Sequence, residues 1–247
     1  MADQIEGRNP VLEALRAGHE ITKIYIQKNE TPSGPLREIL GLAERQRIPL
    51  HPVDLPALNR MAQTRNHQGI IAVAAQWKYA TLEQILERAA AKGEPPFLLF
   101  LDGVEDPQNL GSIIRTAEAA GVHGIIIPER RSAGLSGAVS RASAGAIEYV
   151  PVARVTNLTK TVEELKKAGI WFTGAEMDGK VEFQKADLTG PMGLVMGGEG
   201  KGISRLLAEH CDQIVRLPMW GRINSLNVAV ATGIVLYEVR RQRAERQ

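Results

Sequence analysis

Short apolar stretches and helical patterns alternate along the whole chain, which is typical of an α/β protein. In the first part of the chain, strands are predicted over 23–28 and 69–76, and helices over 9–18, 35–46 and 81–92. The run Gly93-Glu94-Pro95-Pro96 stops the last of these helices and marks the best domain boundary. We therefore expect an N-terminal domain at 1–76, a linker with a short helix at 77–96, and a larger domain at 97–247.

The larger domain begins with Phe97 to Leu101, a continuous apolar strand of the kind found in sheets that are covered on both faces. Further strands are predicted over 124–127, 149–152, 170–174, 193–196 and 213–217, and helices over 109–120, 136–143, 157–168 and 203–210. The last helix starts near Leu226 and is apolar on all sides as far as Tyr237. Its first half is therefore expected to be buried.

The composition of the 247 residues, 44% apolar and 23% charged, is typical of a folded protein. No apolar run is long enough to cross a membrane, and the acidic N-terminus does not look like a signal peptide. A single cysteine, Cys211, excludes an internal disulfide framework, and with five histidines it gives no plausible zinc cluster. We expect a cytoplasmic protein with no metal and no membrane partner.

Basic residues are concentrated at the C-terminus, although the net charge is only +2. Four of the last eight residues are arginines: Arg240, Arg241, Arg243 and Arg246. Cations suit the C-terminal end of a helix and help to solubilise its surface. They also permit an RNA partner without requiring one.

Three segments of the larger domain are unusually rich in polar residues and glycine. The first, Asp102 to Asn109, runs from a strand end into a helix. In that helix Leu110, Ile113, Ile114 and Ala117 form one apolar stripe, and Arg115 lies about 150° from its centre. Arg115 is therefore expected to point away from the core, either as a solvated surface residue or as part of a site.

The second segment, Met196 to Gly202, is a glycine-rich loop between a buried strand and a helix. Glycine lets the backbone approach a ligand closely, and ligands of open α/β sheets bind at the carboxyl ends of the strands. The triphosphate-binding pattern fails, because Val195 and Gly202 stand where it needs Gly and Ser or Thr, and the dinucleotide pattern GxGxxG fails too. The loop suits a nucleoside-like ligand; the alternative is a flexible turn.

The third segment, 217–227, again joins a strand end to a helix start. Asn224 or Ser225 is a suitable N-cap residue for the following helix. A single cap does not account for the two asparagines, the serine and the arginine that crowd this stretch. We therefore regard Ser225 as a candidate for a site as well as for a cap.

In this order and spacing the three segments resemble the three motifs of the SpoU/TrmH family of RNA ribose methyltransferases, in the SPOUT superfamily. The matching residues are 106–111 with Arg115 and Gly121, then 197–202, then 218–219 with 225–227. The stretches 6–15 and 67–69 resemble the RNA-binding domain of a subgroup, which has a ribosomal-protein-like α/β fold. The resemblance is closest to the RlmB-type enzymes, which methylate a guanosine of large-subunit ribosomal RNA.

The resemblance implies an open SPOUT-type sheet with a C-terminal trefoil knot, and a homodimer with its active sites near the subunit interface. It also implies S-adenosylmethionine as the methyl donor and no metal. The implied catalytic residues are Asn109, Arg115, Glu199, Ser225 and Asn227, and the implied donor-binding residues are Met196, Gly197, Gly198, Leu217, Met219 and Leu226. The family pattern does not cover 220–224, so Trp220 and Arg222 receive no role.

The implied reaction is methyl transfer to a ribose 2′-hydroxyl, which needs in-line alignment and removal of the hydroxyl proton. Taking a proton from an arginine at pH 7 costs about 7.5 kcal/mol or more. The resemblance gives Arg115 the role of base, but at this cost Arg115 is better suited to gripping the adjacent phosphate. Glu199, directly or through water, is an alternative base. Transfer RNA is the second candidate substrate. A non-catalytic RNA-binding protein is a further alternative, but it would be expected to have lost Arg115, Glu199 or Asn227.

Overall fold

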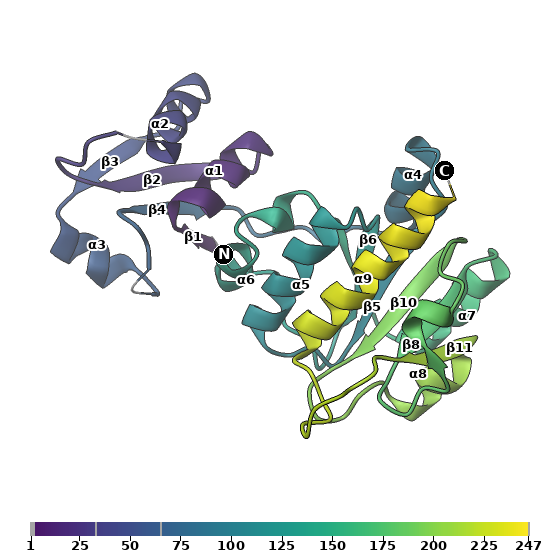
Figure 1. Cartoon of the computed structure of the whole chain (residues 1–247). Coiled ribbons are helices and arrows are strands. Elements are labelled where there is room, and N and C mark those ends of the chain that lie inside the picture. The colour runs from purple at the N-terminus through teal and green to yellow at the C-terminus, as the bar shows by residue number, and fades with distance from the viewer. Residues whose placement is uncertain (1–2, 33, 65, 247) are drawn as a thin grey trace. The chain divides into compact units, whose positions relative to one another are not determined.

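The computed structural model describes residues 3–32, 34–64 and 66–246 (Figure 1). Contacts divide the chain into two compact units, Met1–Lys78 with Gly134–Tyr149, and Tyr79–Ala133 with Val150–Gln247. The first unit thus takes in a segment that the sequence pattern placed in the larger domain. A helical pattern identifies which face of a helix is buried, but it carries no information about which body covers that face.

The first unit is built on a four-stranded sheet of order β1-β4-β2-β3, in which only β2 and β3 are parallel. Its strands are β1 (Asp3–Glu6), β2 (Ile21–Gln27), β3 (Leu50–Val53) and β4 (Ile70–Ala74), and its helices are α1 (Arg8–Arg16), α2 (Pro35–Arg45), α3 (Leu55–Met61) and α6 (Gly137–Ala142), with the short η1 (Ala146–Glu148). The apolar faces of α1 and α2 meet the sheet around the fully buried Ile24 and Ile70. Helix α6 packs against β1, where the backbone of Gly137 lies against the carbonyl of Gln4.

The two N-terminal stretches named above lie together in this unit. The backbone N–H of Arg8 donates to Gln68 Oε1 at 2.9 Å, and its guanidinium Nε donates to the Gln68 carbonyl at 3.1 Å. Next to them, the fully buried carboxylate of Glu6 accepts from the backbone and the hydroxyl of Thr64, and Arg141 of α6 lies 3.4 Å from it. Buried charge needs such partners, so this network orders the chain segments around β1.

The second unit contains a seven-stranded sheet of order β7-β6-β5-β10-β8-β11-β9, with every adjacent pair parallel. Its strands are β5 (Phe97–Asp102), β6 (Gly124–Pro128), β7 (Val152–Val155), β8 (Trp171–Ala175), β9 (Val181–Glu182), β10 (Met192–Gly197) and β11 (Gln213–Arg216). Strand β7 begins three residues later than predicted, because η1 occupies Ala146–Glu148.

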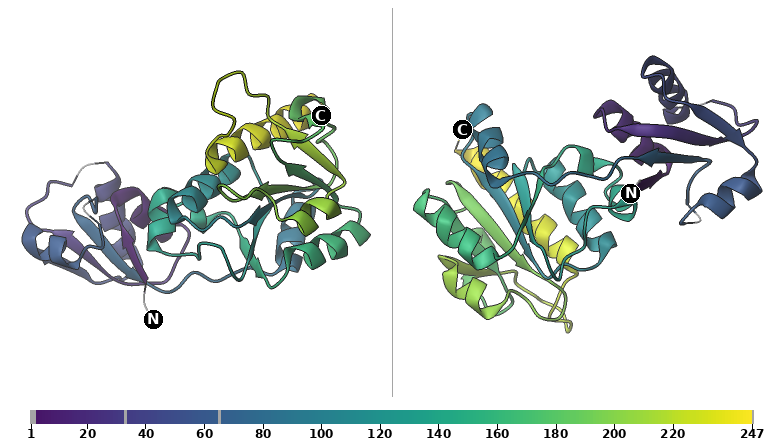
Figure 2. Two further views of the ribbon diagram at one scale, coloured as in Figure 1. Left: turned by 90° about the horizontal axis from the view of Figure 1, so that it is seen from below. Right: turned by 180° about the vertical axis from the view of Figure 1, so that it is seen from behind.

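Helices cover both faces of this sheet (Figures 1 and 2). They are α4 (Leu82–Ala91), α7 (Leu158–Lys167) and α8 (Arg205–His210) on one face, and α5 (Pro107–Ala119) and α9 (Val228–Glu245) on the other, with η2 (Phe183–Lys185) near α9. Strand β5 is buried at every position, as its continuous apolar run predicted. The prediction of an open α/β sheet is confirmed. Helix α4, which the sequence pattern placed in a linker, packs here through the buried Ile85.

Helix α9 departs from its prediction. It begins at Val228 rather than near Leu226, and its first half is not buried all round. Val230, Ile234 and Tyr237 are 52%, 39% and 55% exposed, and their spacing places them on one face of the helix. The helix packs along α5 and β10, so this opposite stripe is uncovered in a single chain. Among the described residues, no helix is long and apolar enough to cross a membrane.

The C-terminal arginines of α9 bind the protein itself. Arg243 is 6% exposed and donates to the carbonyls of Pro95, Pro96 and Gly190 at 2.9, 3.0 and 2.7 Å. Arg240 donates to the carbonyls of Ala120 and Gly121, Arg241 pairs with Glu238 and Glu245, and Arg246 pairs with Asp187. The C-terminal arginines therefore bond to carbonyls and carboxylates of the chain itself. The charge pattern of the sequence did not indicate these contacts.

Candidate functional site at the carboxyl ends of the strands

The strand order of the second unit reverses between β5 and β10. From β5 the chain proceeds through β6 to β7 in one direction, whereas β10 adjoins the half that contains β8 and β11. Gly197 at the end of β10 is in register with Asp102 at the end of β5. Such a switch point is where open α/β sheets bind their ligands. All three polar segments of the sequence analysis begin at this edge of the sheet.

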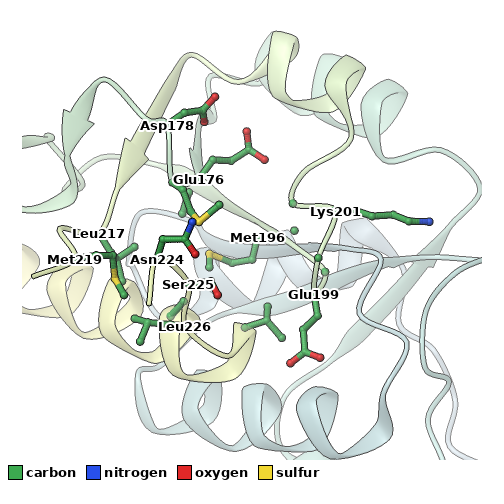
Figure 3. A pocket seen from close by; sticks show the side chains of 18 residues that line it. Glu176, Asp178, Met196, Glu199, Lys201, Leu217, Met219, Asn224, Ser225 and Leu226 are labelled. Atoms are coloured by element: carbon green, nitrogen blue, oxygen red, sulfur yellow. The ribbon is translucent and has the colours of Figure 1, made fainter. Parts of the chain in front are cut away.

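A cavity of about 600 Å³ opens at this edge (Figure 3). Its walls are the turn after β8, the glycine loop after β10, the stretch after β11 and the start of α9. All six residues expected to bind a donor line it: Met196, Gly197, Gly198, Leu217, Met219 and Leu226. Trp220 and Arg222 do not line it, and the side chain of Trp220 is 91% exposed.

The glycines of the loop are required by close backbone packing. A Cβ on Gly197 would lie 2.0 Å from the carbonyl carbon of Gly202, and one on Gly198 would lie 2.0 Å from the Gly103 carbonyl oxygen. Gly200 and Gly202 have φ of +79° and +63°, where other residues are strained. The Gly202 N–H donates back to the Gly198 carbonyl at 3.2 Å. The loop is therefore a folded element of the cavity wall and not a loose turn.

One side chain from each polar segment joins a hydrogen-bonded cluster beside the loop. The amides of Asn109 and Asn227 both donate to Glu199 Oε1, at 3.1 and 2.9 Å, and Asn227 also donates to Asn109 Oδ1 at 2.9 Å. Asn227 is the N-cap of α9, since its Oδ1 accepts from the backbone N–H of Ala229 and Val230. The backbone N–H of Asn109 donates to Asp106, the cap of α5. Helix starts thus hold both amides in place.

The remaining two expected catalytic residues lie outside this cluster. Ser225 is exposed and lines the cavity, and the interpretation of Asn224 or Ser225 as the N-cap was wrong, because Asn227 performs that role. Arg115 is exposed on α5, away from the core as predicted. It makes no hydrogen bond or ion pair within the part of the chain that the structure describes. Among the described residues, no hydrogen bond joins Arg115 to the cluster.

A second cavity of about 350 Å³ lies on the other side of the glycine loop. Asn109 and Glu199 line it together with the basic side chains of Arg131 and Lys201. The loop residues Gly198, Glu199, Lys201 and Gly202 line both cavities, and the cluster residue Asn109 lines the smaller one. This arrangement suits two substrates that meet across the loop. Within the described ranges, no group of three His, Cys, Asp or Glu side chains could hold a metal ion.

Two acidic residues of the site were not anticipated from the sequence. Glu176 and Asp178 follow β8 and line the larger cavity, where Figure 3 shows them at the end remote from Glu199. Glu176 Oε1 accepts from the backbone N–H of Ile203 at 2.7 Å. The available signal was a carboxylate placed directly after a buried strand, Thr173-Gly174-Ala175-Glu176. That pattern alone is common, and it becomes informative only once β8 is known to lie beside β10.

Two family models match the chain. The SpoU rRNA Methylase family model matches residues 96–237, and a model described as RNA 2′-O ribose methyltransferase substrate binding matches residues 4–80. The chain is 45% identical over 241 residues to YacO of Bacillus subtilis (strain 168), a protein named for the TrmH family of tRNA/rRNA methyltransferases. That alignment covers 98% of this chain and 96% of the relative.

Solved structures of similar fold cover nearly the whole chain. The SpoU methyltransferase AviRb from Streptomyces viridochromogenes, crystallised with AdoMet, superposes with a TM-score of 0.81 at 27% identity, over 98% of this chain and 90% of its own. An AdoMet-bound rRNA methyltransferase from Sinorhizobium meliloti gives 0.79 at 28% identity, over 97% and 87%. The likeness therefore extends over both units of the chain.

Proposed function

Because the chain belongs to the SpoU/TrmH family of RNA methyltransferases, we propose that it methylates the ribose 2′-hydroxyl of a guanosine in large-subunit ribosomal RNA, with S-adenosylmethionine as the donor. The observation that carries this proposal is the meeting of three sequence segments beside one glycine-walled cavity. Each segment contributes one member of the cluster Asn109, Glu199 and Asn227.

The larger cavity fits an S-adenosylmethionine molecule in size and chemistry. Pockets for small ligands are typically about 300–1,000 Å³ and mostly apolar, with a few placed polar groups. Here Met196, Leu217 and Leu226 supply apolar walls, and Gly197 and Gly198, whose backbone packing leaves no room for a Cβ, line the cavity with backbone alone. Bound there, the donor supplies an already activated methyl group on a sulfonium. Both similar structures described above contain the same molecule.

We assign the proton transfer to Glu199. Its Oε1 accepts hydrogen bonds from two amides, which fix the orientation of the carboxylate before the substrate binds. A carboxylate accepts the hydroxyl proton directly or through one water. Arg115 is given the grip on the adjacent phosphate, for which a planar guanidinium is well suited. We assign contact with the acceptor ribose to Ser225, which lines the cavity beside Leu226.

We further propose a homodimer formed through the first half of α9. The exposed stripe of Val230, Ile234 and Tyr237 is apolar, and apolar stripes on helices are usually covered by a partner. In the dimer we expect Arg115 to reach the cluster that it does not meet in a single chain. Ile234→Ser with Val230→Ser should therefore give a monomer by light scattering and lower turnover, whereas retained dimers would contradict the proposal.

The N-terminal domain is proposed to choose the RNA. Residues 1–76 would bind the substrate and 97–247 would carry out the transfer, an assignment that the substrate-binding match at 4–80 supports. A transfer RNA substrate is the second candidate, because the relative YacO is named for both RNA types. The non-catalytic alternative is disfavoured, since Arg115, Glu199 and Asn227 are all present. The trefoil knot and the cytoplasmic location stay predictions.

Mapping of ribose methylation by mass spectrometry tests this proposal. Total RNA is compared from cells with the protein, without it, and with the Glu199→Gln variant in its place. We expect one 2′-O-methylguanosine of large-subunit RNA to be absent in the last two. Loss of a site in transfer RNA instead would support the second candidate, and no change in any RNA would contradict the enzymatic function.

A further inference from the structure

The turn after β8 is fixed to the neighbouring strand β11. The backbone N–H of Glu176 donates to the Val215 carbonyl at 2.9 Å, and the N–H of Gly179 donates to the Glu176 carbonyl at 3.3 Å. A Cβ on Gly179 would lie 2.4 Å from the carbonyl carbon of Val215, so the turn is in close contact with β11. The backbone of Glu176 is therefore held before its side chain makes any contact.

From this fixed position the Glu176 side chain reaches the far end of the glycine loop. Its Oε1 accepts from the backbone N–H of Ile203 at 2.7 Å, and Ile203 is 5% exposed. A Cβ on Gly202 would lie 2.6 Å from the same oxygen. A buried N–H without an acceptor is unfavourable, so this contact stabilises the conformation of the loop.

A second carboxylate holds the next amide of the loop. Asp102, at the end of β5, accepts from the Ser204 N–H at 2.8 Å, and its carbonyl accepts from the Gly198 N–H at 2.7 Å. The two carboxylates differ in what else they face. Asp102 lines the smaller cavity with the polar cluster, whereas Glu176 lines the larger one. Glu176 is thus the loop contact on the donor side.

We propose that Glu176 is a positioning residue for the methyl donor. It holds the end of the glycine loop against the turn after β8, and through Val215 it fixes the loop relative to β11. The continuation of β11 forms another wall of the same cavity at Leu217. One side chain therefore sets the spacing between two walls that receive the donor. The identity of the ligand rests on the proposed function, but the contact with the loop does not.

Two conservative variants separate geometry from charge. Glu176→Gln removes the charge but keeps an acceptor oxygen at the same reach. Glu176→Asp keeps the charge but is one methylene shorter, so its carboxylate falls short of the Ile203 N–H. Asp178→Asn is the matched control, because it removes a charge from the same cavity without any hydrogen bond to the loop in the described structure.

The first readout is hydrogen exchange of the amides of 198–204 in the protein without donor. We expect exchange at Ile203 to be about tenfold faster in Glu176→Asp, and close to wild type in Glu176→Gln and Asp178→Asn. The second readout is calorimetric titration with S-adenosylmethionine. We expect about tenfold weaker binding for Glu176→Asp, which corresponds to about 1.4 kcal/mol, and a change below about threefold for Glu176→Gln.

The outcomes separate the positioning role of Glu176 from the assignment of the cavity to the methyl donor. Unchanged exchange in Glu176→Asp, or binding by Glu176→Gln as weak as that of Glu176→Asp, would overturn the positioning role. In the second case the charge would act on the ligand itself. If wild type bound no S-adenosylmethionine while exchange at Ile203 still followed the pattern above, the donor assignment would fail and the loop contact would stand. Glu176→Gln keeps every contact of the side chain, so at least one informative variant should fold.

Discussion

Where the strands of the second unit's sheet begin, buried polar side chains bond to backbone groups inside the protein. Arg243 binds three carbonyls there, its guanidinium carbon lies 4.9 Å from the centre of the Phe97 ring, and burial lowers its pKa to about 10. The fully buried His123 accepts from the Phe97 N–H through Nδ1 at 3.0 Å. Where the strands end, Asn109, Glu199 and Asn227 bond to one another, but Asn109 is only half-buried and the other two are exposed.

The same parallel sheet thus has a closed end, where the strands begin and side chains stabilise the fold, and an open end, where the strands end and a ligand can bind. Parallel strands place all their carboxyl ends at one edge, so loops from distant parts of the chain meet there. Helix α9 connects the two ends, with Asn227 at its start and Arg243 near its finish. The comparison predicts that substitutions at one end change activity without changing stability, and that substitutions at the other do the reverse.

The largest effect is expected from Glu199→Gln at the open end. The variant keeps an oxygen for both asparagine amides but loses the base, so turnover should fall about hundredfold or more. Its free energy of unfolding should stay within about 0.5 kcal/mol of wild type, because the residue is exposed. Single-turnover methylation and denaturant unfolding measure the two quantities, with Glu118→Gln on α5 as an exposed control. Near-normal turnover would remove Glu199 from the proton transfer.

The next effect is expected from Arg243→Met at the closed end. The apolar stem is retained, but three carbonyls lose their donor, so the free energy of unfolding should fall by about 3 kcal/mol. Arg246→Met, three residues later and exposed, removes only surface contacts with Asp187 and Thr189 and should cost less than about 1 kcal/mol. Donor affinity of the folded Arg243→Met protein should be unchanged. A tenfold loss of affinity would show that the two ends are coupled through α9.

The smallest effect concerns pH at the closed end. Burial lowers the pKa of His123 to about 4, below the ordinary value of 6.5. As pH falls below 6.5, His123 binds a proton in the unfolded chain, whereas in the folded chain it stays neutral until about pH 4. The free energy of unfolding therefore decreases with acidification. Between pH 7 and pH 5 this histidine should lower the free energy of unfolding by about 2 kcal/mol.

His123→Asn tests that assignment, because the amide oxygen can accept from the Phe97 N–H and does not titrate. Urea unfolding at pH 7 and pH 5 should show a smaller loss of stability in this variant than in wild type. His51→Asn, an exposed histidine of β3, is the control and should keep the wild-type loss. Equal losses in all three proteins would show that His123 does not titrate as its burial predicts.

Much of this organisation could be predicted from local sequence. Strand β5 follows from its unbroken apolar run, and α4 from its capping box, in which Thr81 and Gln84 each accept from the backbone of the other. The three polar segments could be placed together because each follows a strand end of a parallel sheet. The cluster residues Asn109, Glu199 and Asn227 were named by the family resemblance, and the structure brings them together.

Features that depend on packing partners could not be predicted in this way. The exposed stripe of α9 is made of apolar residues, as a buried stripe would be. The sequence pattern therefore could not show that no part of the chain covers it. Helix α6 belongs with the first unit through contacts with β1, which no local pattern encodes. Glu176 gains its contact only because β8 lies beside β10, a pairing between segments about twenty residues apart.

The central claim, transfer to a ribose oxygen, is tested most directly with a synthetic RNA that carries one 2′-deoxy nucleotide at the mapped target. The protein is incubated with this RNA or its all-ribose twin and S-adenosylmethionine bearing a labelled methyl group, and the products are digested to nucleosides. The account predicts a 2′-O-methylated nucleoside from the ribose RNA and no label in the deoxy RNA. Label on a base nitrogen or carbon, or equal labelling of both RNAs, would contradict it.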